Sequence, residues 1–166
     1  MKDLQHAPLW MAVTLATAFT ACGGGGGSMT TAVIAPSGIG SVTLDPVTKI
    51  LTGSFNTTNV VSATAAHIHD GDVGVAGPVV VPLEQSSVGS AMWVVPANTI
   101  LTDAQIARLQ AGGFYVNVHT TLNPTGEIRG QLTKDSATVN KFNATLDQAH
   151  EVPATKNPAT GAVGGY

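Results

Sequence analysis

The sequence predicts an all-β fold, a Greek-key-like β-sandwich or barrel with one short helix at about residues 102–111. Three observations predict it. Only 10% of the 166 residues are charged, and the chain holds 19 Gly and 9 Pro. Short runs rich in Val, Thr and Ile recur, separated by turn signals. Helices normally carry more Glu, Lys, Arg and Leu, whereas many short strands at this spacing are typical of a sandwich or barrel.

The individual elements follow from the apolar runs and the residues between them. Asp45-Pro46 starts a turn signal between two β-prone runs, and a segment rich in Asn, Pro and Gly at residues 122–126 separates two others. The helix has Thr102 as its N-cap and ends before Gly112-Gly113. The predicted strands are residues 41–44, 50–55, 79–83, 91–95, 114–120 and 127–132.

The N-terminus has the pattern of a bacterial export signal. Residues 7–21 form a mostly apolar stretch, too short to cross a bilayer comfortably but suited to the core of a signal peptide. The stretch ends in Phe-Thr-Ala before Cys22, which resembles a lipobox, and a run of five glycines follows as a flexible tether. We therefore predict a signal peptide over residues 1–21, then a lipidated Cys22 and a Gly-rich linker over residues 22–28.

These features bound the location and the partners of the protein. A lipid anchor predicts a membrane-attached protein of the cell envelope, at the outer membrane if the cell is Gram-negative, because Gly23 rather than Asp follows the cysteine. The net charge is −3 and no run of Lys or Arg is present, so the sequence gives no support for nucleic-acid binding. Cys22 is the single cysteine, which excludes an internal disulfide.

Four short motifs follow one another along the predicted strands, at residues 66–69, 77–80, 115–120 and 126–132. In this order they resemble the signature of the CHRD (chordin-type) family, over about residues 38–132 and within a predicted β domain of residues 29–134. The resemblance implies a non-enzymatic module. In animal chordins such domains belong to an extracellular growth-factor antagonist, and bacterial members have no generally assigned activity.

The tail, residues 135–166, departs from the family pattern. The family usually opens with a strand of the type Phe-x-Ala-x-Leu followed by Glu-Val-Pro, and here these motifs come at the other end, as residues 142–146 and 151–153. Two interpretations stay open: the tail is a strand that completes the domain, or it is the start of a truncated second CHRD repeat. Because an unpaired sheet edge is a liability, we expect the tail to dock on the domain.

Strand alternation gathers polar side chains on one outer face of the sheet. His67 and His69 share one face of their strand. The outward residues of the two later strands are Asn117, His119, Glu127 and Arg129, and we expect them on the same side of the sheet. Three histidines from neighbouring strands suit copper or zinc, because their neutral imidazole nitrogens can converge. The candidate metal ligands are His67, His69 and His119. The alternative is a hydrogen-bonded network kept for folding, in which Arg129 pairs with a glutamate and which comprises Asn117, Glu127, Arg129 and Glu151.

Two functions follow from these features. The first is a non-enzymatic cell-envelope module, which binds an unknown extracellular or envelope protein or has a structural role. The second is a periplasmic protein that binds copper or zinc through the histidines. No hydrolase elbow and no paired carboxylates are present, so we expect no enzyme. The His-x-His strand is also similar to copper-zinc superoxide dismutases, but the ligands for a second metal are missing.

Overall fold

A computed structural model describes residues 34–155. The expected signal peptide, Cys22 and linker lie outside these residues. Within them, no helix has both the length and the apolar character needed to cross a membrane. The elements in chain order are β1 (Ser37–Leu44), β2 (Ile50–Thr58), β3 (Ala63–Asp70), β4 (Val79–Gln85), β5 (Met92–Val94), β6 (Thr99–Ile100), α1 (Asp103–Gln110), β7 (Phe114–Thr120), β8 (Ile128–Gln131), β9 (Thr133–Lys134) and β10 (Lys141–Asp147).

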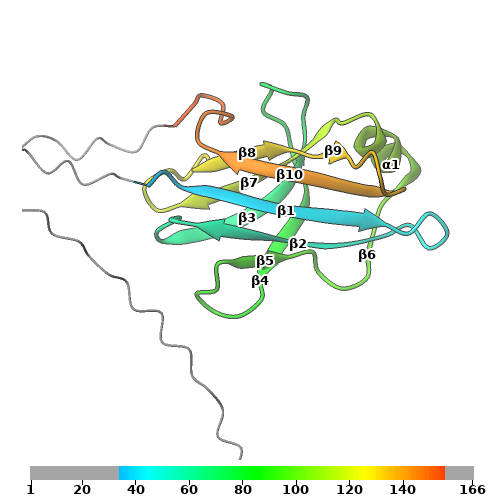
Figure 1. Ribbon diagram of the computed structural model, residues 1–166, viewed down its shortest axis with the longest axis horizontal. Coiled ribbons are helices and arrows are strands. Elements are labelled where there is room, and N and C mark those ends of the chain that lie inside the picture. Colours follow the sequence, from blue (N-terminus) through cyan, green and yellow to red (C-terminus); the bar gives the residue numbers. More distant parts are fainter. Residues whose placement is uncertain (1–33, 156–166) are drawn as a thin grey trace, which may run out of the picture. The chain divides into compact units, whose positions relative to one another are not determined.

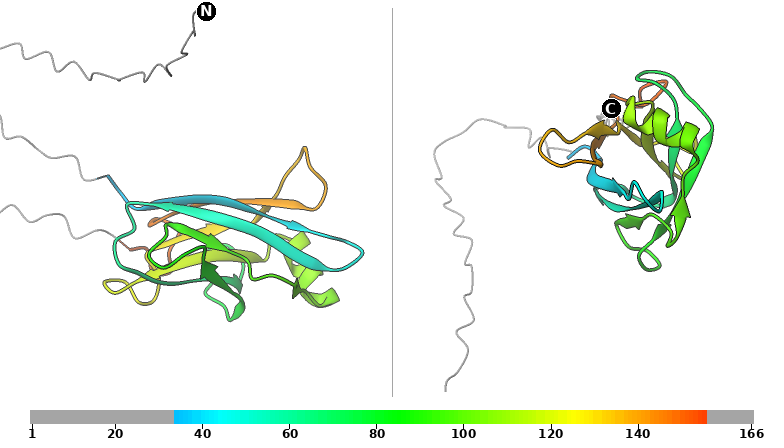
Figure 2. Two further views of the ribbon diagram at one scale, coloured as in Figure 1. Left: turned by 90° about the horizontal axis from the view of Figure 1, so that it is seen from below. Right: turned by 90° about the vertical axis from the view of Figure 1, so that its right-hand side faces the viewer.

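Eight of the strands form a closed antiparallel barrel (Figures 1 and 2). Their order is β1-β10-β8-β7-β3-β4-β5-β2, and β2 pairs with β1 again to close the ring. The short strands β6 and β9 pair with β2 and β10. The predicted all-β fold with one short helix is confirmed. Closure leaves none of these eight strands as a free sheet edge.

The barrel interior is filled by alternate residues of the strands, as the period of a β-strand requires. On β3, Ala66 and Ile68 are fully buried and point inward, so the histidines between and after them face outward. Val116 and Val118 do the same on β7. Trp93 belongs to this core too, at 4% exposure. The core therefore fixes which face of β3 and β7 carries the polar side chains.

The tail supplies β10, which lies between β1 and β8 (Figure 1). Leu146 stands opposite Gly38 on β1, and both Phe142 and Leu146 are buried in the core. β1 lies between β10 and β2, and the backbone of β2 approaches it closely. A Cβ atom at Gly40 would come within 2.2 Å of the Ser54 carbonyl oxygen, so only glycine fits there. Residues 141–147 are thus a full member of the barrel.

Helix α1 lies near one end of the barrel (Figure 1). Capping residues mark both of its ends. Thr102 accepts a hydrogen bond from the Gln105 backbone N–H, and the Gln105 side chain accepts one from the Thr102 N–H, which makes a capping box. After Ala111 the chain reverses at Gly112, whose φ of 76° suits glycine. The helix is one residue shorter at each end than predicted.

Candidate metal centre

The three histidines lie together on the outer face of β3 and β7. His67 and His69 stand on β3, and His119 stands on β7, which pairs with β3. Each residue offers a ring nitrogen, and these three nitrogens all lie within 4.8 Å of one another. Among the described residues, this is the one cluster of His, Cys, Asp and Glu side chains that could hold a metal ion.

Backbone carbonyls fix the tautomers of two of these rings. His69 Nδ1 lies 2.9 Å from the Gly77 carbonyl oxygen, and His119 Nδ1 lies 3.0 Å from that of Pro124. Because a carbonyl oxygen can only accept, both Nδ1 atoms carry the proton and both Nε2 atoms carry a lone pair. His67 Nδ1 lies 3.0 Å from His119 Nε2 and therefore donates to it. His69 Nε2 is buried and has no hydrogen-bond partner in the described chain.

Burial keeps the cluster uncharged. Desolvation lowers the pKa of His67, His69 and His119 below the ordinary value of 6.5, and the mutual repulsion of the protonated rings adds to the effect at His67 and His69. All three rings are thus neutral at pH 7. A neutral imidazole is the form that binds a metal ion, so no proton has to be released before binding.

The spacing of the nitrogens is close to what a metal ion requires. Imidazole nitrogens bind Zn²⁺ at about 2.0–2.1 Å, so two ligands on one ion lie about 3.3–3.6 Å apart. His67 Nδ1 and His119 Nε2 stand at 3.0 Å and would separate slightly, with the His67 proton moving to the other nitrogen of that ring, and the other pairs would close from at most 4.8 Å. Rotations of the rings supply shifts of this size. His69 is buried and the other two rings are half-buried, which leaves an approach from solvent.

A stack of aromatic and charged groups supports His69 from the side. The Tyr115 ring stacks on the His69 ring, with centroids 4.9 Å apart and an interplanar angle of 8°. The Arg129 guanidinium carbon lies 3.4 Å from the centroid of the same Tyr115 ring, a cation–π contact. Tyr115 thereby restricts the orientation of a candidate ligand ring.

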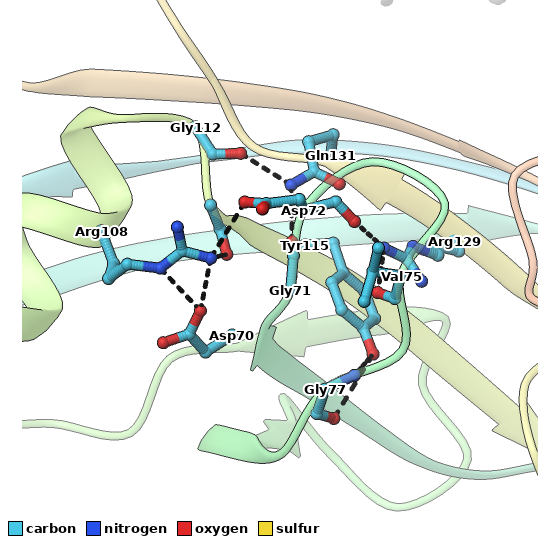
Figure 3. A network of polar contacts seen from close by, with 11 residues as sticks. Asp70, Gly71, Asp72, Val75, Gly77, Arg108, Gly112, Tyr115, Arg129 and Gln131 are labelled. Carbon is cyan, nitrogen blue, oxygen red and sulfur yellow. Dashed lines mark hydrogen bonds and ion pairs between the residues drawn. The ribbon is translucent and has the colours of Figure 1, made fainter.

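The β3–β4 loop, residues 71–78, forms a roof over this stack (Figure 3). Arg129 Nη2 donates to the carbonyls of Asp72 and Val75 at 2.9 Å each, and Gln131 Nε2 donates to that of Gly71 at 2.9 Å. The Gly77 N–H donates to the Tyr115 hydroxyl at 3.1 Å. The loop therefore covers the part of the outer face around Tyr115 and His69, which explains why His69 is buried while His67 and His119 are only half-buried.

Arg108 ties helix α1 to the same loop. Its guanidinium forms ion pairs with Asp70 at 2.8 Å and with Asp72 at 3.0 Å (Figure 3). The acidic Asp-Gly-Asp segment thus has an arginine for its partner.

The predicted polar network is divided into separate groups. Asn117 Nδ2 donates to Glu151 Oε2 at 3.2 Å. The Glu127 carboxylate lies at the β7–β8 turn, where its hydrogen-bond donors are Thr120, Asn123 and Gln148. Arg129 binds the loop carbonyls, and no ion pair joins it to either glutamate within residues 34–155. Arg129 therefore makes its hydrogen bonds to the loop, and its charge acts on Glu151 without a direct ion pair among these residues.

Three further groups contribute to this site. The strand alternation of β7 places Tyr115 on the outer face, so its position can be predicted from the sequence. The carbonyls of Gly77 and Pro124 cannot be predicted in this way, since every residue has the same backbone oxygen.

The fold and the site together define the class of the protein. It is a small antiparallel β-barrel module with a histidine cluster on its outer face. The model of the CHRD domain matches residues 22–132, and the chain belongs to the CHRD domain family. The predicted resemblance is confirmed, and membership supports a non-enzymatic module in general. No curated protein and no solved structure matches the chain.

Proposed function

We propose that this chain is a non-enzymatic CHRD module of the cell envelope that binds one copper or zinc ion through His67, His69 and His119. One observation carries the proposal. His69 Nε2 is a buried lone pair without a partner among residues 34–155, and it belongs to a cluster whose ring nitrogens lie within 4.8 Å of one another. A buried acceptor without a partner costs about 1–3 kcal/mol, and a bound ion removes that cost.

The surroundings of the cluster support a transition metal. A metal-binding histidine usually donates its second ring N–H to a carbonyl or carboxylate, and His69 and His119 both do so. Three imidazoles favour zinc or copper, whereas calcium and magnesium prefer oxygen ligands. Three protein ligands leave a fourth position for water or for a side chain of a partner protein.

The location in the envelope rests on the sequence motif. The lipobox-like segment before Cys22 supports a lipid anchor, and Gly23 supports the outer membrane in a Gram-negative cell. We therefore expect wild-type protein to incorporate a labelled fatty acid and to fractionate with membranes. Cys22→Ser should lose both properties, and labelling of Cys22→Ser equal to the wild type would contradict the anchor.

The metal proposal is tested by titrating the full chain, purified in detergent, with Cu²⁺ and with Zn²⁺. Calorimetry and elemental analysis should give one ion per chain, and the ion should raise the melting temperature. At a free ion concentration of 100 times Kd, the stabilisation is about 2.7 kcal/mol.

Two variants make the assignment specific. The double variant His67→Ala/His69→Ala should lose binding. His150→Ala is the matched control, since His150 is exposed, pairs with Asp147 and lies outside the cluster. Equal binding by the double variant and the wild type would reject these ligands. No binding of either metal by wild type would favour the other function, an envelope module that binds a protein or has a structural role.

A further inference from the structure

Residues 148–155 fold back from β10 onto the β7–β8 end of the barrel, away from α1 (Figure 1). Two side chains of this segment bind Glu127: Gln148 Nε2 donates to its Oε1 at 2.8 Å, and Thr155 Oγ1 donates to its carbonyl at 2.8 Å. Between them, Glu151 is only 7% exposed. The segment is thus anchored by two ordinary hydrogen-bonding side chains and one buried carboxyl group.

The buried carboxyl group faces an amide with which it shares only one hydrogen bond. Asn117 Nδ2 donates to Glu151 Oε2 at 3.2 Å. The two other oxygens of the pair, Asn117 Oδ1 and Glu151 Oε1, are buried and have no partner in the described chain. Both are acceptors when the glutamate is ionised, so neither can satisfy the other. A proton on the carboxyl group would turn one of them into a donor.

The space around the pair is closed on the side of the β7–β8 turn. A Cβ atom at Gly126 would lie 2.5 Å from one Glu151 carboxylate oxygen and 2.6 Å from the other. It would also lie 2.6 Å from Asn117 Nδ2. The absence of a side chain at Gly126 therefore makes room for the two planar groups.

We propose that Glu151 and Asn117 form a carboxylic acid–amide pair, and that this pair is a proton-operated latch holding residues 148–155 on the barrel. In the closed state Glu151 is neutral, its hydroxyl donates to Asn117 Oδ1, and its other oxygen accepts from Asn117 Nδ2. Loss of the proton to solvent removes the first of these bonds and leaves a buried carboxylate. The latch goes beyond metal binding and does not depend on it.

The electrostatic environment sets the pH at which the latch opens. Burial raises the pKa of Glu151 to about 7. Arg129 opposes this shift by attraction, and Glu127 adds to it by repulsion. The charged groups that act on Glu151 are Arg129 on β8 and Glu127 at the β7–β8 turn, and His150 beside it in the chain lines a cavity together with it. Since a glutamate in an unfolded chain has a pKa near 4.3, the stabilisation is complete below that pH and disappears as the pH rises through about 7.

Opening of the latch changes the surface beside the histidine cluster. A cavity of about 190 Å³ lies between the β3–β4 loop, β8 and residues 149–152, and it includes Arg129 and Gln131 in its lining. Release of the segment removes one wall of this cavity and exposes Asn117, the cross-strand neighbour of His67. The latch therefore links external pH to the access of solvent and partners to this face.

Hydrogen–deuterium exchange of the full chain, measured in a chelator so that metal has no part in it, tests the latch. In the wild type, the protection of residues 148–155, corrected for intrinsic exchange, should fall by about tenfold per pH unit above pH 7, the limit for one proton. The barrel strands should keep their protection. Protection that is unchanged from pH 6 to pH 8.5 would overturn the latch.

Two variants separate the proton from the contact. Glu151→Gln carries an amide that can make both hydrogen bonds without a proton, so its segment should stay docked at both ends of the pH range. Glu84→Gln, at an exposed position of β4, is the matched control, and it should follow the wild type. A Glu151→Gln chain with the wild-type pH dependence would reject the mechanism.

If Glu151→Gln does not fold, an NMR titration of the Glu151 carboxyl carbon in the wild-type chain decides the question. A midpoint near pH 7 supports the latch. A midpoint near 4.3, the value of a free glutamate, overturns it.

Discussion

Truncation of Leu146 to alanine tests whether the C-terminal strand is part of the core. Leu146 is fully buried on β10, and its cross-strand neighbour on β1 is Gly38, which has no side chain to fill a hole. A Cβ atom built on Gly38 would already lie 3.3 Å from Ile128 Cδ1, so the wall on this side is backbone and Ile128. The cavity should therefore persist, which places the cost in the upper half of the range for Leu→Ala, about 3–5 kcal/mol.

Urea unfolding of the full chain, followed by circular dichroism, measures this cost. With a slope of about 2 kcal/mol per molar urea, the midpoint of Leu146→Ala should fall by about 1.5–2.5 M. Ile39→Ala on the adjacent β1 is the control, because Ile39 is 65% exposed and its truncation should change stability by no more than about 0.5 kcal/mol. A Leu146→Ala chain as stable as Ile39→Ala would refute the placement of β10 in the barrel.

Three further predictions concern the turn, the helix cap and the histidines. Gly126→Ala, at a φ of 148°, should displace Glu151 and cost about 1–3 kcal/mol in urea, with loss of exchange protection confined to residues 148–155; unchanged protection there would contradict the packing. Thr102→Ala should cost about 1 kcal/mol by removing the cap of α1, and thermal unfolding measures it. Because burial lowers the pKa of the clustered histidines, their contribution to metal-free stability is present above pH 6.5 and lost as the pH falls. Urea midpoints from pH 7.5 to 5 should therefore decline more steeply in the wild type than in a chain with the three histidines changed to Gln.

Local patterns in the sequence predict the faces of the strands and the limits of the helix. The alternation around Ile68 places His67 and His69 outside the barrel, because a strand repeats every two residues and the apolar face must be buried. The helix limits follow from Thr102 and Gly112, whose backbone roles depend on their own chemistry. These features need no knowledge of distant contacts.

The covering of the site could not be predicted in the same way. The roof over Tyr115 depends on hydrogen bonds from Arg129 and Gln131 to carbonyls more than 50 residues earlier in the chain. A carbonyl acceptor has no residue identity, so no motif marks it. Strand alternation also does not predict the direction of a side chain at the end of a strand. Glu127 lies just before β8, and its carboxylate bonds to Thr120 at the β7–β8 turn rather than to Arg129.

The hydrogen bonding of the three rings favours a binding cluster over a purely structural one. A histidine kept only for folding can direct each buried ring nitrogen to a partner, because an orphaned polar atom destabilises the fold. His119 meets this condition, because its two ring nitrogens bond to Pro124 and His67. His69 bonds to Gly77 and stacks on Tyr115, but its Nε2 has no partner in the described part of the chain. Binding of an ion would break the His67–His119 hydrogen bond, a net cost of about 0.5–1.5 kcal/mol, against the roughly 10–16 kcal/mol that a structural zinc site supplies. We therefore expect the cluster to need little rearrangement to accept an ion.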